Sequence, residues 1–252
     1  IELARKGENN IFWSSKIKWF AKSSGTTNAK SKFIPVSNES LEDCHYAAGK
    51  DLLCMYLSNN PNSQLFTGKS LRLGGSKTPY EKNGTFYGDL SAILIDNMPF
   101  WAEFSSTPSN KTSLMDDWDY KMVAIINETL NENVTSLAGV PSWMLVLLNK
   151  ILKESKKEYI SEIWPNLEVY FHGGVSFKPY LNQYDAIINK DSMQYYEIYN
   201  ASEGFFAIQY ENNSNELLLM LDYGIFYEFI PMKTYGKKNE KIISLNEVEK
   251  DI

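Results

Sequence analysis

The stretch LEVYFHGGVSFKPY, residues 167–180, gives the clearest indication of the fold. Its first part, LEVYF, is rich in aromatic and branched side chains and predicts a strand. Gly173 and Gly174 follow, and a helix is expected from about Lys178 to Asn189. Paired glycines at the end of a strand let a flat ligand approach the backbone, although a tight strand-to-helix turn uses the same residues. The order of strand, glycine pair and helix predicts an α/β sheet.

Other predicted elements surround this unit. Three more helices are expected, at residues 40–57, 116–130 and 140–155. Strand-like runs follow at residues 195–199, 205–210, 217–223 and 226–231. Mixed helices and strands followed by consecutive strands predict an α/β fold with a mixed β-sheet core and flanking helices. No internal repeat or linker is evident, so we expect residues 1–252 to form a single domain.

Composition narrows the functional classes. The 252 residues are 43% apolar and 22% charged, as in a globular protein, and the formal net charge is −6. This charge argues against a general affinity for nucleic acid. No apolar run approaches the roughly 18 residues of a membrane span. Cys44 and Cys54 lie too far apart along one predicted helix to form a bridge, and free thiols predict a cytoplasmic location.

Common catalytic motifs are absent from the sequence. There is no P-loop, no G-x-G-x-x-G fingerprint and no G-x-S-x-G nucleophile elbow. With only His45 and His172, a histidine-rich metal centre is excluded. A Cys–His dyad is formally possible, but two thiols buried in a helix are the favoured interpretation.

Two segments remain that could bind a nucleotide. SSGTT, residues 23–27, offers hydroxyl donors and a glycine that lets backbone N–H groups turn inward, with lysines on both sides. Such a cluster is by itself usually an ordinary loop. YNASEG, residues 199–204, follows a predicted strand and offers an aromatic face, a hydroxyl and a carboxylate. These groups suit a base, a phosphate oxygen and Mg²⁺.

The order of these segments resembles the acyl-adenylate-forming superfamily. The matching stretches are AGVPSWMLVLL (138–148), FHGGVSFKP (171–179) and YNASEGFFAIQ (199–209). With FAKSSGTTNAKSKFIP (20–35) and YGIFYEFIP (223–231), they look like the bacterial relatives of the plant auxin-responsive acyl-acid amido synthetases. The likeness runs from Phe20 to about Pro231. It implies the N-terminal domain fold of adenylate-forming enzymes, and the use of ATP to adenylate a carboxylic acid that is then joined to an amino acid.

The resemblance also implies roles for individual residues. The ATP phosphates would be held by Ser23, Ser24, Gly25, Thr26 and Thr27, with Lys32 as a helper. The base would lie against Gly173, Gly174, Val175 and Tyr199, with Asn200 and Ala201 in the same nucleotide segment. Ser202 would bond the α-phosphate and Glu203 would bind Mg²⁺. An apolar or aromatic acid would lie near Val140, Trp143, Met144 and His172.

One departure limits the resemblance. Members of this family are about twice as long and continue into a ribose-binding motif and a mobile C-terminal lid, neither of which we find before Ile252. The chain is therefore expected to be the central portion of the large adenylation domain, and to be inactive alone. Three alternatives stay open at this point: an acyl-CoA or acyl-protein synthetase, a non-catalytic nucleotide-binding remnant, and a purely structural fragment.

Overall fold

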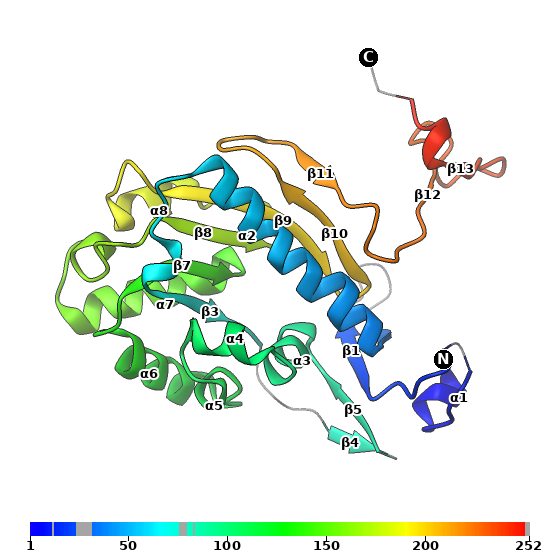
Figure 1. The fold of residues 1–252 in the computed structure, drawn as a ribbon, viewed down its shortest axis with the longest axis horizontal. Helices are drawn as coiled ribbons and strands as arrows, with labels where there is room; N and C mark the ends of the chain where they lie inside the picture. The colour runs from blue at the N-terminus through cyan, green and yellow to red at the C-terminus, as the bar shows by residue number, and fades with distance from the viewer. Residues whose placement is uncertain (12, 24–31, 76–79, 83, 250–252) are drawn as a thin grey trace.

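A mixed seven-stranded sheet forms the centre of the protein (Figure 1). The computed structural model describes residues 1–11, 13–23, 32–75, 80–82 and 84–249. The sheet has the order β11-β10-β9-β8-β7-β3-β6, with parallel pairing from β6 to β9 and antiparallel pairing from β9 to β11. Its strands are β3 (Lys69–Leu73), β6 (Ser106–Thr107), β7 (Val134–Gly139), β8 (Val169–Gly173), β9 (Gln194–Ala201), β10 (Gly204–Gln209) and β11 (Leu217–Leu219). The predicted mixed α/β fold is confirmed.

Three helices cover one face of this sheet: α6 (Trp118–Thr129), α7 (Pro141–Ser155) and α8 (Leu181–Ile188). Helix α7 begins with Pro141. Backbone N–H groups in the first turn of a helix have no intrahelical acceptor, so the absence of an N–H on proline costs no hydrogen bond there. Its buried stripe then recurs every three or four residues, as predicted, and joins the larger core; the stripe is Met144, Leu147, Leu148, Ile151 and Leu152.

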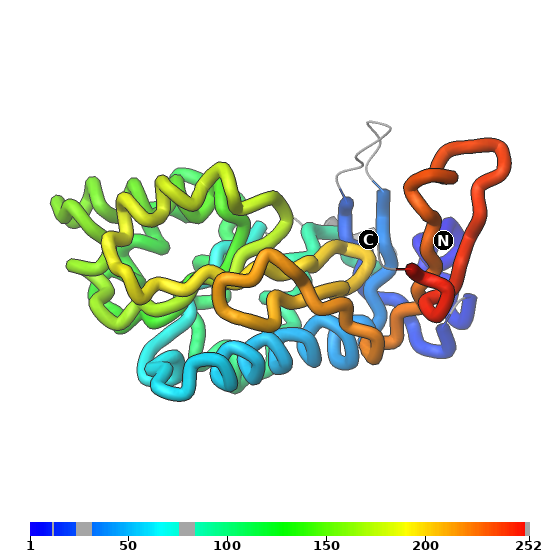
Figure 2. Tube along the Cα trace, turned by 90° about the horizontal axis from the view of Figure 1, so that it is seen from above, coloured from blue at the N-terminus to red at the C-terminus, as the bar shows by residue number. Residues whose placement is uncertain are grey.

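A long helical segment covers the opposite face (Figures 1 and 2). It consists of a π-helical turn, Ser40–Tyr46, followed by α2 (Ala47–Asn59). The sequence predicts a helix over 40–57 with Ser40 as its cap, whereas residues 38 and 39 are already helical and the Ser37 hydroxyl accepts the backbone N–H of Ser40 at 3.0 Å. Its buried residues form a second core with β8, β9 and β10. Cys44 is buried, Cys54 is exposed, and both are free thiols.

A second, four-stranded sheet adjoins the first. Its order is β2-β1-β5-β4, from strands β1 (Trp19–Ser23), β2 (Lys32–Val36), β4 (Tyr80–Lys82) and β5 (Thr85–Gly88). Phe20 and Tyr87 pack there with Ala4 of α1 (Glu2–Arg5). On the other side, Ala21 packs with residues of β2, the π-helical turn and α3 (Leu90–Asp96).

The C-terminal residues lie beside the main body, at the end where α1 is found (Figure 2). Strand β12 (Glu228–Phe229) pairs there with β13 (Ile243–Ser244). The sequence predicts longer strands over 217–223 and 226–231, whereas β11 stops at Leu219 and β12 has two residues. The remaining short helices of the described residues are α4 (Phe100–Phe104), α5 (Asn110–Ser113) and the 3₁₀ turns Leu65–Thr67, Ile160–Glu162 and Leu245–Glu247.

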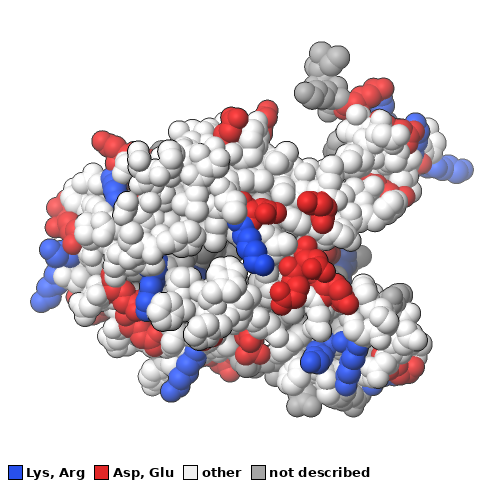
Figure 3. Space-filling model, in the orientation of Figure 1, with Lys and Arg blue, Asp and Glu red and all other residues white. Residues whose placement is uncertain are grey.

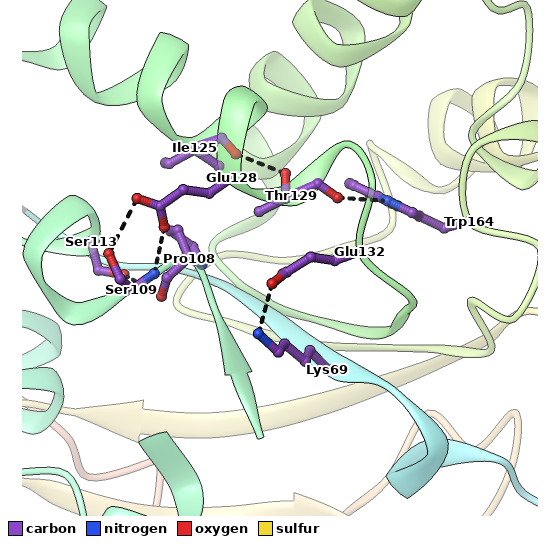
Figure 4. Close-up of polar contacts among 9 residues, drawn as sticks. All are labelled: Lys69, Pro108, Ser109, Ser113, Ile125, Glu128, Thr129, Glu132 and Trp164. Carbon is purple, nitrogen blue, oxygen red and sulfur yellow. Dashed lines mark hydrogen bonds and ion pairs between the residues drawn. The ribbon is translucent and has the colours of Figure 1, made fainter. Parts of the chain in front are cut away.

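Polar contacts fasten α6 to its neighbours (Figure 4). The Glu128 carboxylate accepts the backbone N–H of Ser109 at 2.8 Å and so caps the segment before α5. The buried indole of Trp164 donates to the carbonyl of Thr129 at 3.2 Å. The second bond satisfies a donor that burial would otherwise leave unpaired. None of the helices in the described part of the chain combines the length and apolar character of a membrane span.

Replacing Leu148 by alanine tests the larger core. The side chain is fully buried on α7, so Leu148→Ala should lower the free energy of unfolding by about 2–5 kcal/mol in chemical denaturation. Val146→Ala, on the exposed side of the same helix, should change it by no more than about 0.5 kcal/mol. Equal losses in the two variants would contradict this packing.

Candidate functional site

The carboxyl ends of four parallel strands meet at one edge of the main sheet. Gly139 at the end of β7 pairs with Leu73 of β3 and with His172 of β8, and Gly173 at the end of β8 pairs with Ile198 of β9. Because β9 continues to Ala201, its last residues follow directly after this contact. The glycine pair and the Tyr199–Glu203 segment are therefore neighbours at the edge where open α/β sheets bind ligands.

Backbone contacts explain the two glycines. A Cβ on Gly173 would lie 2.4 Å from the carbonyl oxygen of Ile198, closer than any side chain can approach. Gly174 has a φ of +83°, in the left-handed region that favours glycine. Its nearest side-chain neighbour is Val140, at 3.6 Å from the position of a Cβ. Val175 follows and is exposed.

A tight hairpin carries the predicted phosphate and metal ligands. Ala201 pairs with Gly204, and Ser202 and Glu203 form the two-residue turn between β9 and β10. Glu203 is exposed to solvent. Tyr199 is 56% exposed and leans on Phe206, with ring centroids 5.0 Å apart. The tyrosine ring is thus braced from β10 while it remains accessible to a ligand.

The predicted phosphate-binding segment is described only at its two ends. Ser23 closes β1 and Lys32 opens β2, and the two residues pair across the antiparallel ladder. Lys32 is exposed. Ser24, Gly25, Thr26 and Thr27 lie outside the described residues. The roles predicted for this segment therefore stay predictions.

The residues predicted to line an acyl pocket separate on α7. Met144 is fully buried in the larger core, whereas Trp143 is half exposed and packs edge-on against Trp118, with centroids 4.8 Å apart. Val140 precedes the helix beside Gly174. Trp143 and Met144 thus point to different sides of α7, while Val140 lies at the edge that carries the glycine pair. The acyl pocket predicted from these residues stays a prediction.

His172 is the β8 residue directly before the glycine pair, and its ring stacks on Phe177, with ring centroids 4.0 Å apart. Burial lowers the pKa of this imidazole to about 4, so the ring is neutral at physiological pH. Its Nδ1 has no hydrogen-bond partner within the described residues. A neutral, stacked imidazole fits a packing role at least as well as contact with an acid.

A family model described as "GH3 family N-terminal domain" matches residues 1–193. The chain belongs to the GH3 family. Two solved structures of acyl acid amido synthetases are similar to it. The first is titled "AtGH3.15 acyl acid amido synthetase in complex with 2,4-DB" and superposes with a TM-score of 0.76 and 15% sequence identity. The match covers 98% of this chain and 52% of that structure's chain. The second is titled "GH3.15 acyl acid amido synthetase" and has a TM-score of 0.72 and 14% sequence identity. This match covers 98% of this chain and 51% of that structure's chain.

These likenesses show the fold, and this GH3 chain spans about half the length of the structures that it matches. ATP-bound MatB from Rhodopseudomonas palustris is also similar, with 16% identity, coverage of 76% of this chain and 31% of its own, and a TM-score of 0.41 that is too low to support an argument. No match is found among curated proteins. The family resemblance read from the sequence is confirmed.

Sequence reasoning missed two buried cations near the same edge of the GH3 domain. The Lys121 ammonium donates to the carbonyls of Gly74 and Gly75, at 2.9 and 3.3 Å, where the chain leaves β3. Burial lowers the pKa of Lys121. The Arg72 guanidinium donates to Met98 and Asn110, and burial lowers its pKa to about 10. A lysine within the apolar stripe of a predicted helix is the signal that could have revealed Lys121.

An open groove of about 380 Å³ lies away from this edge. Lys69 and Asn133, which line it, are at the amino ends of β3 and β7. The exposed rings of Phe66 and Phe104 flank it. Lys69 and Glu132 both line it and form an ion pair at 2.6 Å (Figure 4). Its position at the opposite ends of the strands separates it from the glycine pair and the Tyr199–Glu203 segment.

Adding a methyl group to Gly173 tests the close approach of β8 and β9. Gly173→Ala should lower the free energy of unfolding by about 1–3 kcal/mol, because its Cβ must displace the Ile198 carbonyl. Gly88→Ala is the matched control in a strand, since nothing lies within 4 Å of its Cβ. A Gly173→Ala variant as stable as Gly88→Ala would contradict the contact.

The two buried histidines predict a pH dependence of stability. Burial lowers the pKa of His45 and His172 to about 4 from an ordinary 6.5, so the unfolded chain binds more protons than the folded chain between these values. The free energy of unfolding should therefore fall as the pH drops through 6.5 towards 4. His172→Phe, which keeps a ring on Phe177, should make this fall shallower between pH 7 and about pH 5. An unchanged slope would contradict the assignment.

Proposed function

We propose that this chain is the nucleotide-binding part of an ATP-dependent acyl-acid amido synthetase. The whole protein would adenylate a small carboxylic acid and transfer the acyl group to an amino acid. Membership of the GH3 family supports this proposal. The observation that carries it is the parallel pairing of β8 with β9, because this pairing puts the glycine pair beside Tyr199, Ser202 and Glu203.

The residues divide the work of nucleotide binding. The backbone of Gly173 and Gly174, with Val175, offers a flat surface for the base, and the accessible Tyr199 ring offers a second one. Asn200 and Ala201 belong to the same segment. The Ser202 hydroxyl would donate a hydrogen bond to the α-phosphate. Pairing of β9 with β10 fixes the position of the turn that carries Ser202. Ser23 and Lys32 would contribute from the β1–β2 hairpin, with Ser24, Gly25, Thr26 and Thr27 between them.

The reaction needs no nucleophile from the protein. A carboxylate oxygen of the acid attacks the α-phosphorus, an acyl–oxygen–phosphorus linkage forms, and the bond to pyrophosphate breaks. The amine of the amino acid then attacks the acyl carbonyl carbon and loses a proton to solvent, and AMP leaves with the electron pair of the broken C–O bond. The protein positions the reactants and offsets developing negative charge. This division of work fits a sequence with two histidines and no nucleophile motif.

Glu203 fits a magnesium ion held jointly with the nucleotide. The described residues contain no group of three or more His, Cys, Asp or Glu side chains that could hold a metal. Mg²⁺ is usually bound by one or two carboxylates together with substrate phosphates, so one exposed carboxylate at the turn is sufficient. When bound, the ion supplies charge neutralisation at the phosphates. Glu203 would orient it beside the α-phosphate bonded by Ser202.

Two further features of the proposal concern the whole protein. We propose that residues 1–252 form a single unit of the large adenylation domain, and that turnover needs a closing lid that excludes water. We also propose a cytoplasmic setting, which the free thiols Cys44 and Cys54 support. Val140, near Gly174, would adjoin an apolar acid, with Trp143, Met144 and His172 supporting the surrounding structure.

Carboxylate-dependent exchange of labelled pyrophosphate into ATP tests the first half of the reaction. In the full-length protein, with a panel of aromatic and aliphatic acids, exchange should occur and should fall about a hundredfold in Glu203→Ala. Glu211→Ala, an exposed glutamate beyond the other end of β10, should leave exchange unchanged. No exchange with any acid would overturn the proposed function.

Product analysis tests the second half. With an exchanging acid, the full-length protein should form an amide when amino acids are supplied and no thioester when coenzyme A is supplied. Thioester formation would replace the amido synthetase assignment by an acyl-CoA synthetase. The 252-residue chain alone should bind ATP without completing the reaction, and amide synthesis by this chain would contradict the need for a lid.

A further inference from the structure

The π-helical turn, residues 40–46, contacts both halves of the candidate nucleotide site. Leu41 packs into the cluster that contains Ala21 and Val36 of the β1–β2 hairpin. Cys44 belongs to the core that contains Phe205 of β10. The turn therefore lies between the hairpin that begins the SSGTT segment and the hairpin that carries Ser202 and Glu203 (Figure 1). π-Helical turns are rare in proteins, and many of those that occur lie at functional sites.

Two consecutive residues of the turn reach the β9–β10 hairpin. The Cys44 thiol accepts the backbone N–H of Phe205 at 3.2 Å, where the β9–β10 register shifts between Phe205 and Ala207. His45 is 4% exposed and lies beside the Asn200 side chain. Burial lowers the pKa of His45 to about 4, and this effect exceeds the opposite effect of Asn200, which raises the pKa. The ring next to Asn200 is therefore neutral and carries one N–H and one lone pair.

This contact holds three buried polar atoms without partners. Neither ring nitrogen of His45 has a hydrogen bond to any described residue, and the same is true of Oδ1 of Asn200. Leaving a buried donor or acceptor unpaired costs stability, so such a group in a native fold has a reason. An imidazole N–H and an amide oxygen are complementary, and the two side chains are neighbours at the interface between the helical segment and the sheet. A small adjustment of this interface pairs them.

We propose that His45 is a positioning residue for nucleotide binding, an inference that rests on the proposed function. When ATP occupies the site, the His45 N–H donates to Oδ1 of Asn200. This bond fixes the orientation of the Asn200 side chain and so holds the end of β9, next to Tyr199, against the helical segment. It also sets the hairpin that carries Tyr199, Ser202 and Glu203 relative to the turn that packs on β1 and β2.

Calorimetry with ATP on the full-length protein tests this role. His45→Phe keeps a ring of similar size but removes the donor, and it should weaken ATP binding about fivefold to tenfold, the effect of one hydrogen bond. His45→Gln restores an N–H donor and should recover most of that affinity. The rate of pyrophosphate exchange at saturating ATP should change less than the ATP concentration needed for half-saturation, because His45 does not contact the reacting atoms.

A double-mutant cycle shows whether His45 acts through Asn200. Asn200→Ala should weaken ATP binding, and adding His45→Phe to it should weaken binding no further. Tyr223→Phe is the matched control, because Tyr223 lies in the loop after β11 and donates a 2.7 Å hydrogen bond to Asp51 of α2, which the substitution removes. This control should lower stability without changing ATP affinity. Additive losses for His45 and Asn200, or an equal loss in Tyr223→Phe, would overturn the proposal.

Amide hydrogen exchange separates this inference from the proposed function. In the ATP-bound wild type, residues 199–204 should be protected relative to the free protein, and His45→Phe should lose that protection while Tyr223→Phe keeps it. A wild type that binds no ATP overturns the proposed function. A wild type that binds ATP, with His45→Phe equal to it in affinity and in protection of 199–204, overturns the role of His45 alone.

Discussion

The close approach of β8 to β9 at Gly173 is the constraint on which the rest of the site depends. The Ile198 carbonyl occupies the space that any side chain at residue 173 would need, so the two strands stay in contact to the very end of β8. Because β9 extends beyond this point, its last residues overhang the edge of the sheet beside the glycine pair. The β9–β10 hairpin then turns back at Ser202 and Glu203. A bulkier residue at 173 would separate the strands and move the hairpin away from the glycines.

Local patterns predicted the elements whose signals are local. The stripe of α7 and the aromatic strands β8, β9 and β10 appear where periodicity and composition indicate them. The sequence does not predict the central strands β3 and β7. Strands buried in a parallel sheet usually read as continuous apolar runs, whereas KSLRL and VTSLAG contain polar residues. The last predicted strands are overlong because their pairing depends on partners distant in the sequence. Strand propensity alone cannot identify such partners.

The site was predictable as an ordered set of segments and not as a set of contacts. The sequence placed Gly173, Gly174 and Tyr199 in one site through family resemblance, and the strand register explains why they are neighbours. It grouped Trp143 with Met144, but helical geometry turns the one outward and the other into the core. Lys121 and Arg72 escaped notice because their burial depends on tertiary packing. Their charges lie under the carboxyl edge, where they hold the chain leaving β3 and the segments around α4 and α5.

The alternation of side chains along β9 has a consequence for how this protein can change over time. Tyr199 faces one side of the sheet with Phe206, while Asn200 faces the side covered by the π-helical turn. Inserting or deleting a single residue within β9 would exchange these two positions, burying an aromatic ring against His45 and exposing an amide where a base is to stack. Insertions and deletions among homologues should therefore be absent from residues 194–201 and should occur instead in the exposed turn between β10 and β11.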